Sequence, residues 1–217
     1  MSFLKLNSKY CKLTPEQRLY NLDRPVIGLT GGIATGKSTA SSILASHGAC
    51  IIDADALVKK IYKKNETKIM VSQIVPEAIC DDQIDFKKLR EAFFNDGKVK
   101  SKIETFIYSR LPNQFLETVN TLPSNALIIY DVPLLFEKGL DKLVDLTVVV
   151  YAPKEIQVQR LIKRDRVDEK LAKKIISNQM DIDEKRGLAD FVIKNISDIN
   201  DLNVNIEKFL KTTTTQV

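Results

Sequence analysis

A glycine-rich segment carries the residues of this chain that are best suited to bind phosphate. Residues 31–39 read Gly-Gly-Ile-Ala-Thr-Gly-Lys-Ser-Thr, which fits the P-loop pattern G-x-x-x-x-G-K-[ST]. Backbone N–H groups of such a turn, and of the helix that follows it, point at phosphate oxygens. Lys37 would neutralise the terminal phosphates, and the Ser38 hydroxyl would ligate Mg²⁺. We therefore expect ATP or GTP to bind here.

Carboxylates follow two further apolar runs. Asp131 follows residues 127–130, and four apolar residues before an Asp form the Walker-B pattern, which holds Mg²⁺ directly or through water. Asp53 and Asp55 follow the run 49–52 and can serve as a general base or a metal anchor. Either could instead cap the next helix. A cap needs only one carboxylate, so we assign the chemistry to Asp55 and leave both interpretations of Asp53 open.

A third group of polar residues lies on a helix expected after Pro153. Gln157, Arg160 and Arg164 are spaced by three and four residues and therefore share one helical face. Guanidinium groups match phosphate oxygens, and such a helix can close over ATP as a lid and stabilise charge in phosphoryl transfer. The alternative is an exposed helix with ion pairs between its turns. The predicted nucleotide-binding residues are Gly32, Ile33, Ala34, Thr35, Gly36, Lys37, Ser38, Thr39, Arg160 and Arg164.

The composition is that of an ordinary globular protein. Of the 217 residues, 44% are hydrophobic and 28% are charged, and the net charge is +5. The positive excess is local, because residues 154–174 contain eight basic and four acidic side chains. This segment has no aromatic residue on which a base could stack, so a phosphate clamp explains it better than nucleic-acid binding. We expect no nucleic-acid partner.

We expect a cytoplasmic protein, because we find no targeting signal and no cysteine pattern typical of secreted proteins. No apolar run approaches the ~20 residues that cross a bilayer, and residues 1–12 lack the apolar core of a secretory signal. Cys11, Cys50 and Cys80 lack metal-ligand spacing and fit idle thiols in a reducing compartment. His47 is the single histidine, and a metal site built from histidines needs at least two, so we expect no such site. We expect a cytoplasmic monomer with no membrane partner.

The elements that must position these residues alternate along the chain. Continuous apolar runs separated by helical stretches predict an α/β fold with a parallel sheet covered on both faces. About seventy residues separate the second and third runs, too many for one crossover helix, so we expect a helical insert there. The expected strands are 26–30, 49–52, 126–130, 146–151 and 191–193, and the expected helices of the insert are near 54–64, 66–75, 86–95 and 99–119.

The domain organisation follows from these elements. We expect a nucleotide-binding core at residues 25–58 and 120–217, a lid at about 154–186, and a helical substrate domain at 59–119. Residues 1–24 are expected to be a polar extension with a short helix from Pro15 to Tyr20, and the threonine-rich tail at 212–215 is expected to be frayed.

Together these motifs resemble the dephospho-CoA kinase family. The matching segments are residues 28–39, Ile-Asp-Ala-Asp at 52–55, Asp-Val-Pro-Leu-Leu-Phe-Glu at 131–137, the Gln157 to Asp165 helix, and Gln179 with residues 184–195. The resemblance covers about residues 25–205. It implies a three-layer P-loop NTPase fold of the nucleoside-monophosphate-kinase type, with a five-stranded parallel sheet, a helical substrate-binding insert and a helical lid.

The resemblance also implies a reaction, the phosphorylation of the ribose 3′-hydroxyl of dephospho-CoA by ATP with Mg²⁺, which is the last step of coenzyme A synthesis. Asp55 would take the hydroxyl proton, while Lys37 and Arg160 stabilise charge on the transferred group. The implied metal ligands are Ser38 and Asp131, and the implied acceptor-binding residues are Asp53, Asp55, Lys59, Tyr108 and Leu134.

Three departures from the family pattern leave alternatives open. Tyr108-Ser109 stands where the family usually has His-Pro, and Ala34-Thr35 stands where Gly-Ser is commoner. Phe86-Lys87 replaces an arginine that is usual in the preceding helix, although Leu89-Arg90 remains. The P-loop change is mild because these positions mainly supply backbone N–H groups. Another small-molecule P-loop kinase and a nucleotide-binding protein without turnover remain alternatives. The chain lacks the Asn-Lys-x-Asp guanine signature, which argues against a GTPase.

Overall fold

The computed structural model describes residues 4–216, and these form two compact units. Residues 4–53 and 122–216 make up one, called here the sheet unit, and residues 54–121 make up the other, the helical unit. The division falls at Asp53 because a strand ends there and the helix that follows packs against helices of the insert. Residues 4–24, which the sequence places outside the core, belong to the sheet unit.

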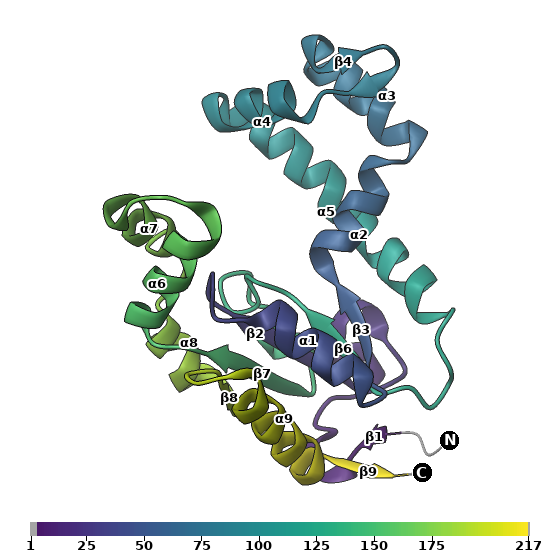
Figure 1. The fold of residues 1–217 in the computed structure, drawn as a ribbon. Coiled ribbons are helices and arrows are strands. Elements are labelled where there is room, and N and C mark those ends of the chain that lie inside the picture. The colour runs from purple at the N-terminus through teal and green to yellow at the C-terminus, as the bar shows by residue number, and fades with distance from the viewer. Residues whose placement is uncertain (1–3, 217) are drawn as a thin grey trace. The chain divides into compact units, whose positions relative to one another are not determined.

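Five parallel strands form the centre of the sheet unit (Figure 1). Their order along the sheet is β3-β6-β2-β7-β8, and every neighbouring pair is parallel. This arrangement confirms the predicted α/β class and the five-stranded parallel sheet. All residues of β2, β6 and β7 are buried, as continuous apolar runs require. The strands are β2 Val26–Gly31, β3 Cys50–Asp53, β6 Ile128–Asp131, β7 Leu146–Tyr151 and β8 Phe191–Lys194.

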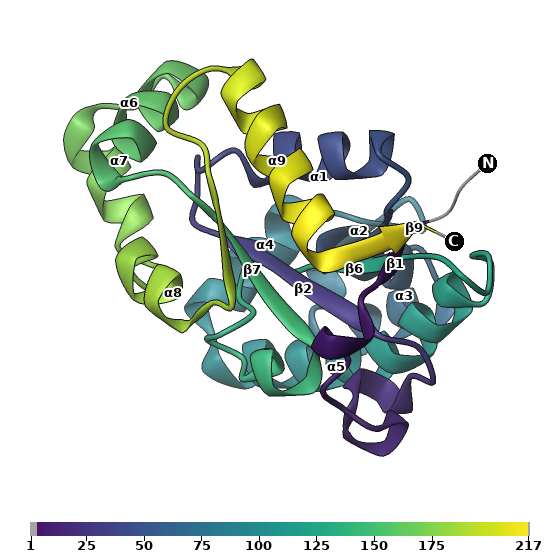
Figure 2. The same cartoon turned by 90° about the horizontal axis from the view of Figure 1, so that it is seen from below.

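Helices cover this sheet and extend from one end of it. The two helices α1 and α9 pack against each other on one face, as Figure 2 shows. Their side chains Leu44 and Phe209 join Leu29 and Val148 of the strands in one apolar core. The two helices α6 and α7 form a projecting arm (Figure 1). The helices of the sheet unit are α1 Lys37–Ser46, α6 Lys154–Asp165, α7 Glu169–Ile176, α8 Ile182–Leu188 and α9 Ile199–Thr213.

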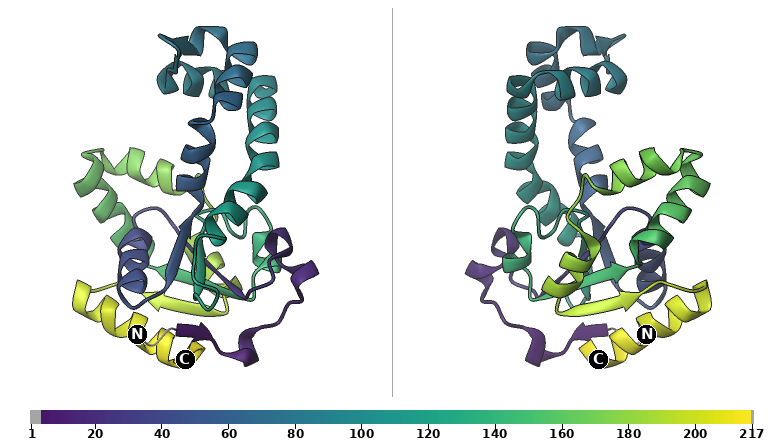
Figure 3. Two further views of the ribbon diagram at one scale, coloured as in Figure 1. Left: turned by 90° about the vertical axis from the view of Figure 1, so that its right-hand side faces the viewer. Right: turned by 90° about the vertical axis from the view of Figure 1, so that its left-hand side faces the viewer.

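Residues 4–24 run along the sheet unit as a strap. Strand β1, Leu4–Leu6, pairs antiparallel with β9, Thr214–Gln216, and Figure 3 shows the two side by side. Leu6 enters the main core. Further along, the buried Arg18 guanidinium donates to buried Asp145 at 2.7 Å, and Asp145 also accepts from the Val26 N–H at 3.0 Å. The strap is therefore fixed to the amino ends of the central strands.

Two local expectations for the chain ends are wrong. The tail is not frayed, because Thr213 is buried in α9 and the residues after it form β9. Residues 15–20 do not form one short helix. They form two 3-10 turns, Pro15–Gln17 and Leu19–Asn21, and Tyr20 has a left-handed φ of 58° that a helix cannot accommodate.

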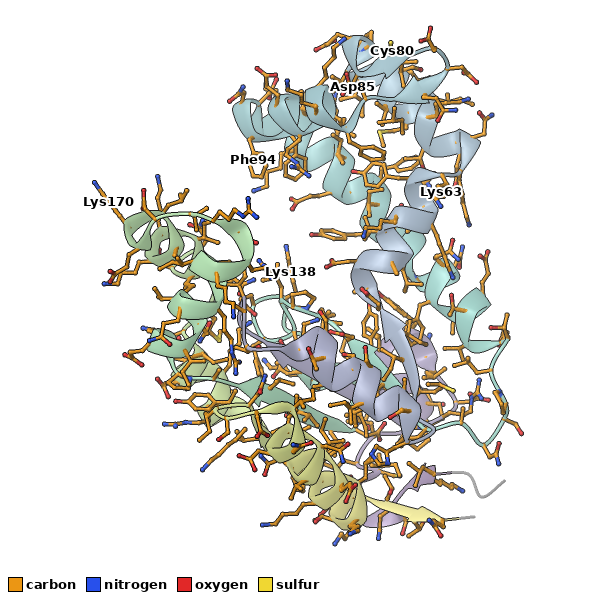
Figure 4. The ribbon with its side chains drawn as sticks, in the orientation of Figure 1. Lys63, Cys80, Asp85, Phe94, Lys138 and Lys170 are labelled. Atoms are coloured by element: carbon orange, nitrogen blue, oxygen red, sulfur yellow. The ribbon has the colours of Figure 1, made fainter. Side chains whose placement is uncertain are left out.

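The helical unit is a separate packing of four helices and a small hairpin. Its own core includes Ile61, Val71, Leu89 and Ile103. Asp85, labelled in Figure 4, caps the helix that follows it by accepting from the Lys87 N–H at 2.9 Å. The helices are α2 Ala54–Tyr62, α3 Asn65–Ile74, α4 Phe86–Asn95 and α5 Gly97–Val119, and the hairpin, which sequence reasoning missed, is β4 Ile79–Cys80 with β5 Gln83–Ile84.

The remaining helical turns are short, and none of the helices within residues 4–216 is both long and apolar enough to cross a membrane. The short turns are Ser8–Tyr10, Pro76–Ala78 and Leu140–Leu143.

Candidate active site

The P-loop connects β2 to α1 in the order that the motif predicts. Gly31 ends the strand and Lys37 begins the helix. Gly36 has φ +87°, and a Cβ there would lie 2.1 Å from the Asn195 amide nitrogen, so only glycine fits. Ala34 also adopts a left-handed φ, 59°, which is strained for a residue with a side chain. The turn therefore needs glycine-like backbone at two positions and has glycine at one.

Thr35 is the residue on which several polar side chains converge. It is fully buried, and its hydroxyl donates to the Gly32 carbonyl at 2.9 Å. The Thr35 carbonyl accepts from Asn195 Nδ2 at 2.8 Å and from Arg160 Nη1 at 3.4 Å. The structure thus brings Arg160 to the P-loop, as its helical spacing suggested. Asn195 was not assigned a role from the residues, although a polar side chain directly after the last strand was a signal for one.

Lys37 and Asp131 meet at the carboxyl end of the sheet. The Lys37 ammonium group pairs with Asp131 Oδ1, and the Ser41 hydroxyl donates to Asp131 Oδ2 at 2.7 Å. Asp131 is buried because it ends β6 in the interior of the sheet, in register with Leu29 of β2. The predicted P-loop lysine and Walker-B carboxylate are therefore in direct contact. Ser38 and Thr39 lie exposed in the first turn of α1.

The predicted acceptor residues are divided between the two units. Asp53 ends β3 in register with Asp131, so both carboxylates lie at one edge of the sheet, and Leu134 follows β6 and is partly buried. Asp55 and Lys59 are exposed on α2, one turn apart on the same face. Tyr108 lies on α5 and is 45% exposed.

The predicted arginine face of α6 contains one buried residue, one P-loop contact and one exposed ion pair. Gln157 is buried and donates to the Ala152 carbonyl at 2.8 Å. A Cβ on Gly32 would approach Gln157 Oε1 to 2.8 Å, which explains the glycine at that position. Arg164 instead forms a two-pronged pair with Asp165 at 2.7 and 2.9 Å, and this hydrogen bonding raises the pKa of Arg164. We keep the nucleotide-binding role of Arg164 as a proposal.

A cavity of about 760 Å³ lies beside α6. Its apolar lining includes Val158, Ile162 and Met180. At its edge Lys154 pairs with Asp181, and this hydrogen bond lowers the pKa of Asp181. The phosphate-handling groups described above, apart from Gly32 and Gln157, lie outside the cavity. We therefore locate the chemistry at the P-loop and not in this cavity.

Sequence reasoning missed a group of polar residues behind the P-loop. Gln179 Oε1 accepts from the Ile33 N–H at 2.9 Å. Lys185 on α8 is fully buried and pairs with Glu137 at 2.8 Å. All three residues stood in family motifs, but no local pattern says which lysine of a charged helix points inward. Each partner lies more than forty residues away along the chain.

These features define the class of the protein. A P-loop follows a central strand of a parallel sheet, a carboxylate ends the neighbouring strand, and a helical arm brings an arginine to the loop. Such a combination is that of a P-loop kinase, a nucleotide-binding phosphotransferase.

Comparison with known proteins narrows this class. The sequence profile of the dephospho-CoA kinase family matches residues 25–201. The chain is 39% identical to dephospho-CoA kinase of Fusobacterium nucleatum over 189 residues, covering 86% of this chain and 97% of that protein. It is 36% identical to the Helicobacter pylori enzyme, covering 86% and 96%. The solved dephospho-CoA kinase of Campylobacter jejuni superposes with a TM-score of 0.66 at 31% identity, covering 86% and 95%.

The chain belongs to the dephospho-CoA kinase family. The reaction of this family is the final step of coenzyme A synthesis, so the chain is a transferase.

Proposed function

We propose that this protein transfers the γ-phosphoryl group of ATP, in the presence of Mg²⁺, to the 3′-hydroxyl of dephospho-CoA. The observation that carries the proposal is the contact between Lys37 of the P-loop and Asp131 on the neighbouring strand, in a chain of this family. These are the cation and the carboxylate that P-loop kinases use for the triphosphate and its metal ion.

The P-loop would bind the triphosphate through its backbone N–H groups, because α1 begins at Lys37 and presents its amino end to the loop. Lys37 would then pair with a phosphate oxygen in place of Asp131. The Asp131 carboxylate would become available to bind Mg²⁺. Arg160 already lies at the Thr35 carbonyl and would stabilise the negative charge that develops on the transferred group.

The donor set fits Mg²⁺. The Ser38 hydroxyl and the Asp131 carboxylate are oxygen ligands of the kind that Mg²⁺ prefers. Within residues 4–216, no group of three or more acidic, His or Cys side chains could hold a metal ion unaided. This suits an ion that takes its remaining ligands from phosphate and water. When bound, the ion would neutralise charge on the phosphates.

Asp55 is the proposed general base. A ribose hydroxyl is a poor nucleophile, and a carboxylate within hydrogen-bond reach can accept its proton during attack. Asp55 is exposed in the first turn of α2, and Lys59 on the same face supplies a positive charge for the phosphates of the acceptor. Tyr108, Asp53 and Leu134 complete the proposed acceptor-binding set.

The substitution Asp55→Asn tests this role, because it keeps the size of the side chain and removes its basicity. We expect kcat for coenzyme A formation to fall by roughly 10²-fold or more, the scale of a lost general base. The affinity for a non-hydrolysable ATP analogue should not change. The matched control is Asp53→Asn, which should affect kcat less. If only Asp53→Asn lost kcat, the roles assigned to Asp53 and Asp55 would have to be exchanged. If neither variant lost kcat, the general base would be another residue.

The acceptor itself is tested with a panel of dephospho-CoA, adenosine, AMP and shikimate. We expect turnover of dephospho-CoA in strong preference to the others. Preference for another acceptor would support a different small-molecule kinase, and ATP binding without turnover would support a nucleotide-binding protein.

We also propose that the protein works as a monomer in the cytoplasm. The free state of Cys11, Cys50 and Cys80 supports a reducing compartment. Size-exclusion chromatography with light scattering would test the monomer, and a dimer peak at micromolar concentration would contradict it.

A further inference from the structure

The proposed function gives no role to Lys185, a buried cation next to the P-loop region. Lys185 on α8 has no exposed surface, although lysine is almost never fully buried unless it is paired. Its ammonium group pairs with Glu137 Oε1 at 2.8 Å and donates to the Pro133 carbonyl at 2.8 Å. Removing a charge from water costs several kcal/mol even after relaxation, so this placement needs a reason beyond filling space.

The partners of Lys185 belong to the loop that follows the Walker-B carboxylate. Pro133 and Glu137 lie in residues 132–137, directly after Asp131. The Pro133 carbonyl also accepts from the Thr30 hydroxyl at 3.1 Å, which ties the same loop to the end of β2. Lys185 therefore connects α8 to both strands that carry the phosphate site.

A second set of bonds connects the start of this segment to the P-loop. The Met180 N–H donates to Glu137 Oε1 at 3.2 Å, the same carboxylate oxygen that Lys185 binds. The adjacent residue, Gln179, accepts from the Ile33 N–H at 2.9 Å. Glu137 thus fixes the backbone next to Gln179, and Gln179 fixes an amide of the P-loop.

Within the described residues, helix α7 makes no hydrogen bond or ion pair to the P-loop or to residues 132–137. Helix α7 packs on α6, and Ala172 is its single buried residue. Lys170 of α7, labelled in Figure 4, is exposed. The segment that returns from the arm to the core, residues 178–188, is joined to the phosphate site by the bonds of Gln179, Met180 and Lys185.

We propose that Lys185 is a positioning residue, which holds Gln179 against the P-loop through Glu137 and keeps residues 178–188 fixed while α6 and α7 close over nucleotide. The closure rests on the proposed function, whereas the anchoring rests on the contacts above. Lys185 itself touches neither ATP nor the acceptor.

The test compares the single variant Glu137→Met with the double variant Lys185→Met/Glu137→Met. The single variant leaves the fully buried Lys185 ammonium group without its carboxylate partner, so Tm should fall. The double variant removes the buried charge as well and puts an apolar side chain of similar volume in its place, so it should regain most of the lost Tm. It should nevertheless bind a non-hydrolysable ATP analogue about tenfold more weakly than the wild type, because Gln179 is no longer held.

Hydrogen exchange provides a readout that stability alone would not change. In the wild type, amides of residues 178–188 should exchange equally with and without the analogue, while those of α7 slow on its addition. In the double variant, residues 178–188 should exchange faster without nucleotide and slow when the analogue is added. Gln179→Met should reproduce the weaker nucleotide binding with no loss of Tm, and the exposed Lys208→Met on α9 serves as the control for a lost positive charge.

The outcomes separate the two proposals. A double variant that regains both wild-type Tm and wild-type affinity for the analogue would show that the pair serves stability alone, and the positioning role would be wrong. Unchanged exchange of residues 178–188 in that variant would contradict it equally. Failure of the wild type to phosphorylate dephospho-CoA would overturn the proposed function but not these binding and exchange results.

Discussion

The sheet unit and the helical unit present their candidate functional side chains in opposite ways. At the phosphate site Lys37 pairs with Asp131, and Arg160 reaches the Thr35 carbonyl. On the helical unit, Asp55 and Tyr108 are exposed on the surfaces of their helices. The first site is preorganised by contacts among its own residues, while the side chains that we propose for acceptor binding lie at the surface of the helical unit.

This difference has a consequence for what each unit tolerates. Residues that hold one another cannot change singly without leaving a buried partner unsatisfied. Exposed residues on a helix change at little cost to the fold, usually within 0.5 kcal/mol. Tyr108 and Ser109 are exposed on α5 of the helical unit, whereas the P-loop residues that donate or accept specific bonds lie in the sheet unit.

The largest effect that would sharpen this comparison is expected from Lys37→Ala. Loss of the cation at the phosphates should reduce turnover roughly 10²- to 10³-fold, the scale of a lost electrostatic donor at a transition state. Asp131 would keep its bond from Ser41, so the protein should still fold. Steady-state kinetics and a thermal melt measure the two quantities, with Lys208→Ala as the control. Turnover equal to the wild type in a folded variant would rule out the P-loop assignment.

A smaller effect, confined to the other unit, is expected from Tyr108→Ala. Because the ring is 45% exposed, Tm should stay within a degree or two of the wild type. The KM for dephospho-CoA should rise about tenfold, equivalent to about 1.4 kcal/mol, with no change in ATP affinity. Ile69→Ala, at another exposed position of this unit, should change neither. A Tyr108 variant with a large loss of stability would break the proposed contrast between the units.

The smallest effect is expected from Ala34→Gly in the P-loop. Ala34 has a φ of 59°, which costs an alanine about 1 kcal/mol relative to glycine. Relief of this strain should raise the free energy of unfolding by up to about 1 kcal/mol, measured by urea denaturation, with little change in kcat. A loss of stability would mean that the added freedom of glycine in the unfolded chain outweighs the strain.

The fold could be predicted further from the sequence than the site could. An apolar run predicts a buried strand from its own residues alone, without knowledge of its neighbours. All five strands of the central parallel sheet were therefore predicted. The hairpin at Ile79–Cys80 and Gln83–Ile84 was missed because two-residue strands have no periodicity. The tail was misjudged because four threonines suggest a solvated end, whereas pairing with β1 makes it a strand.

The site was predictable where chemistry is local and not where it is distant. The P-loop, Asp131 and Arg160 belong to short motifs, so they can be identified from neighbouring residues alone. The roles of Lys185 and Gln179 depend on partners 48 and 146 residues away, namely Glu137 and the Ile33 amide. No property of the residues around Lys185 distinguishes a buried lysine from an exposed one. Such contacts follow from the register of the sheet and the path of the loops, which only the folded chain reveals.

The strap has a consequence for the order in which the chain folds during synthesis. Ribosomes synthesise a chain from its amino end, so Leu4–Leu6 is made long before its partner, Thr214–Gln216. Until that partner is made, β1 remains unpaired, and Leu6 lacks the α9 side chains Phe209 and Leu210 with which it shares a core. The P-loop strand can find its neighbours β6 and β7 earlier, once residue 151 has emerged. Closure of β1 onto β9 is therefore a late step of folding, which follows the pairing of the central strands.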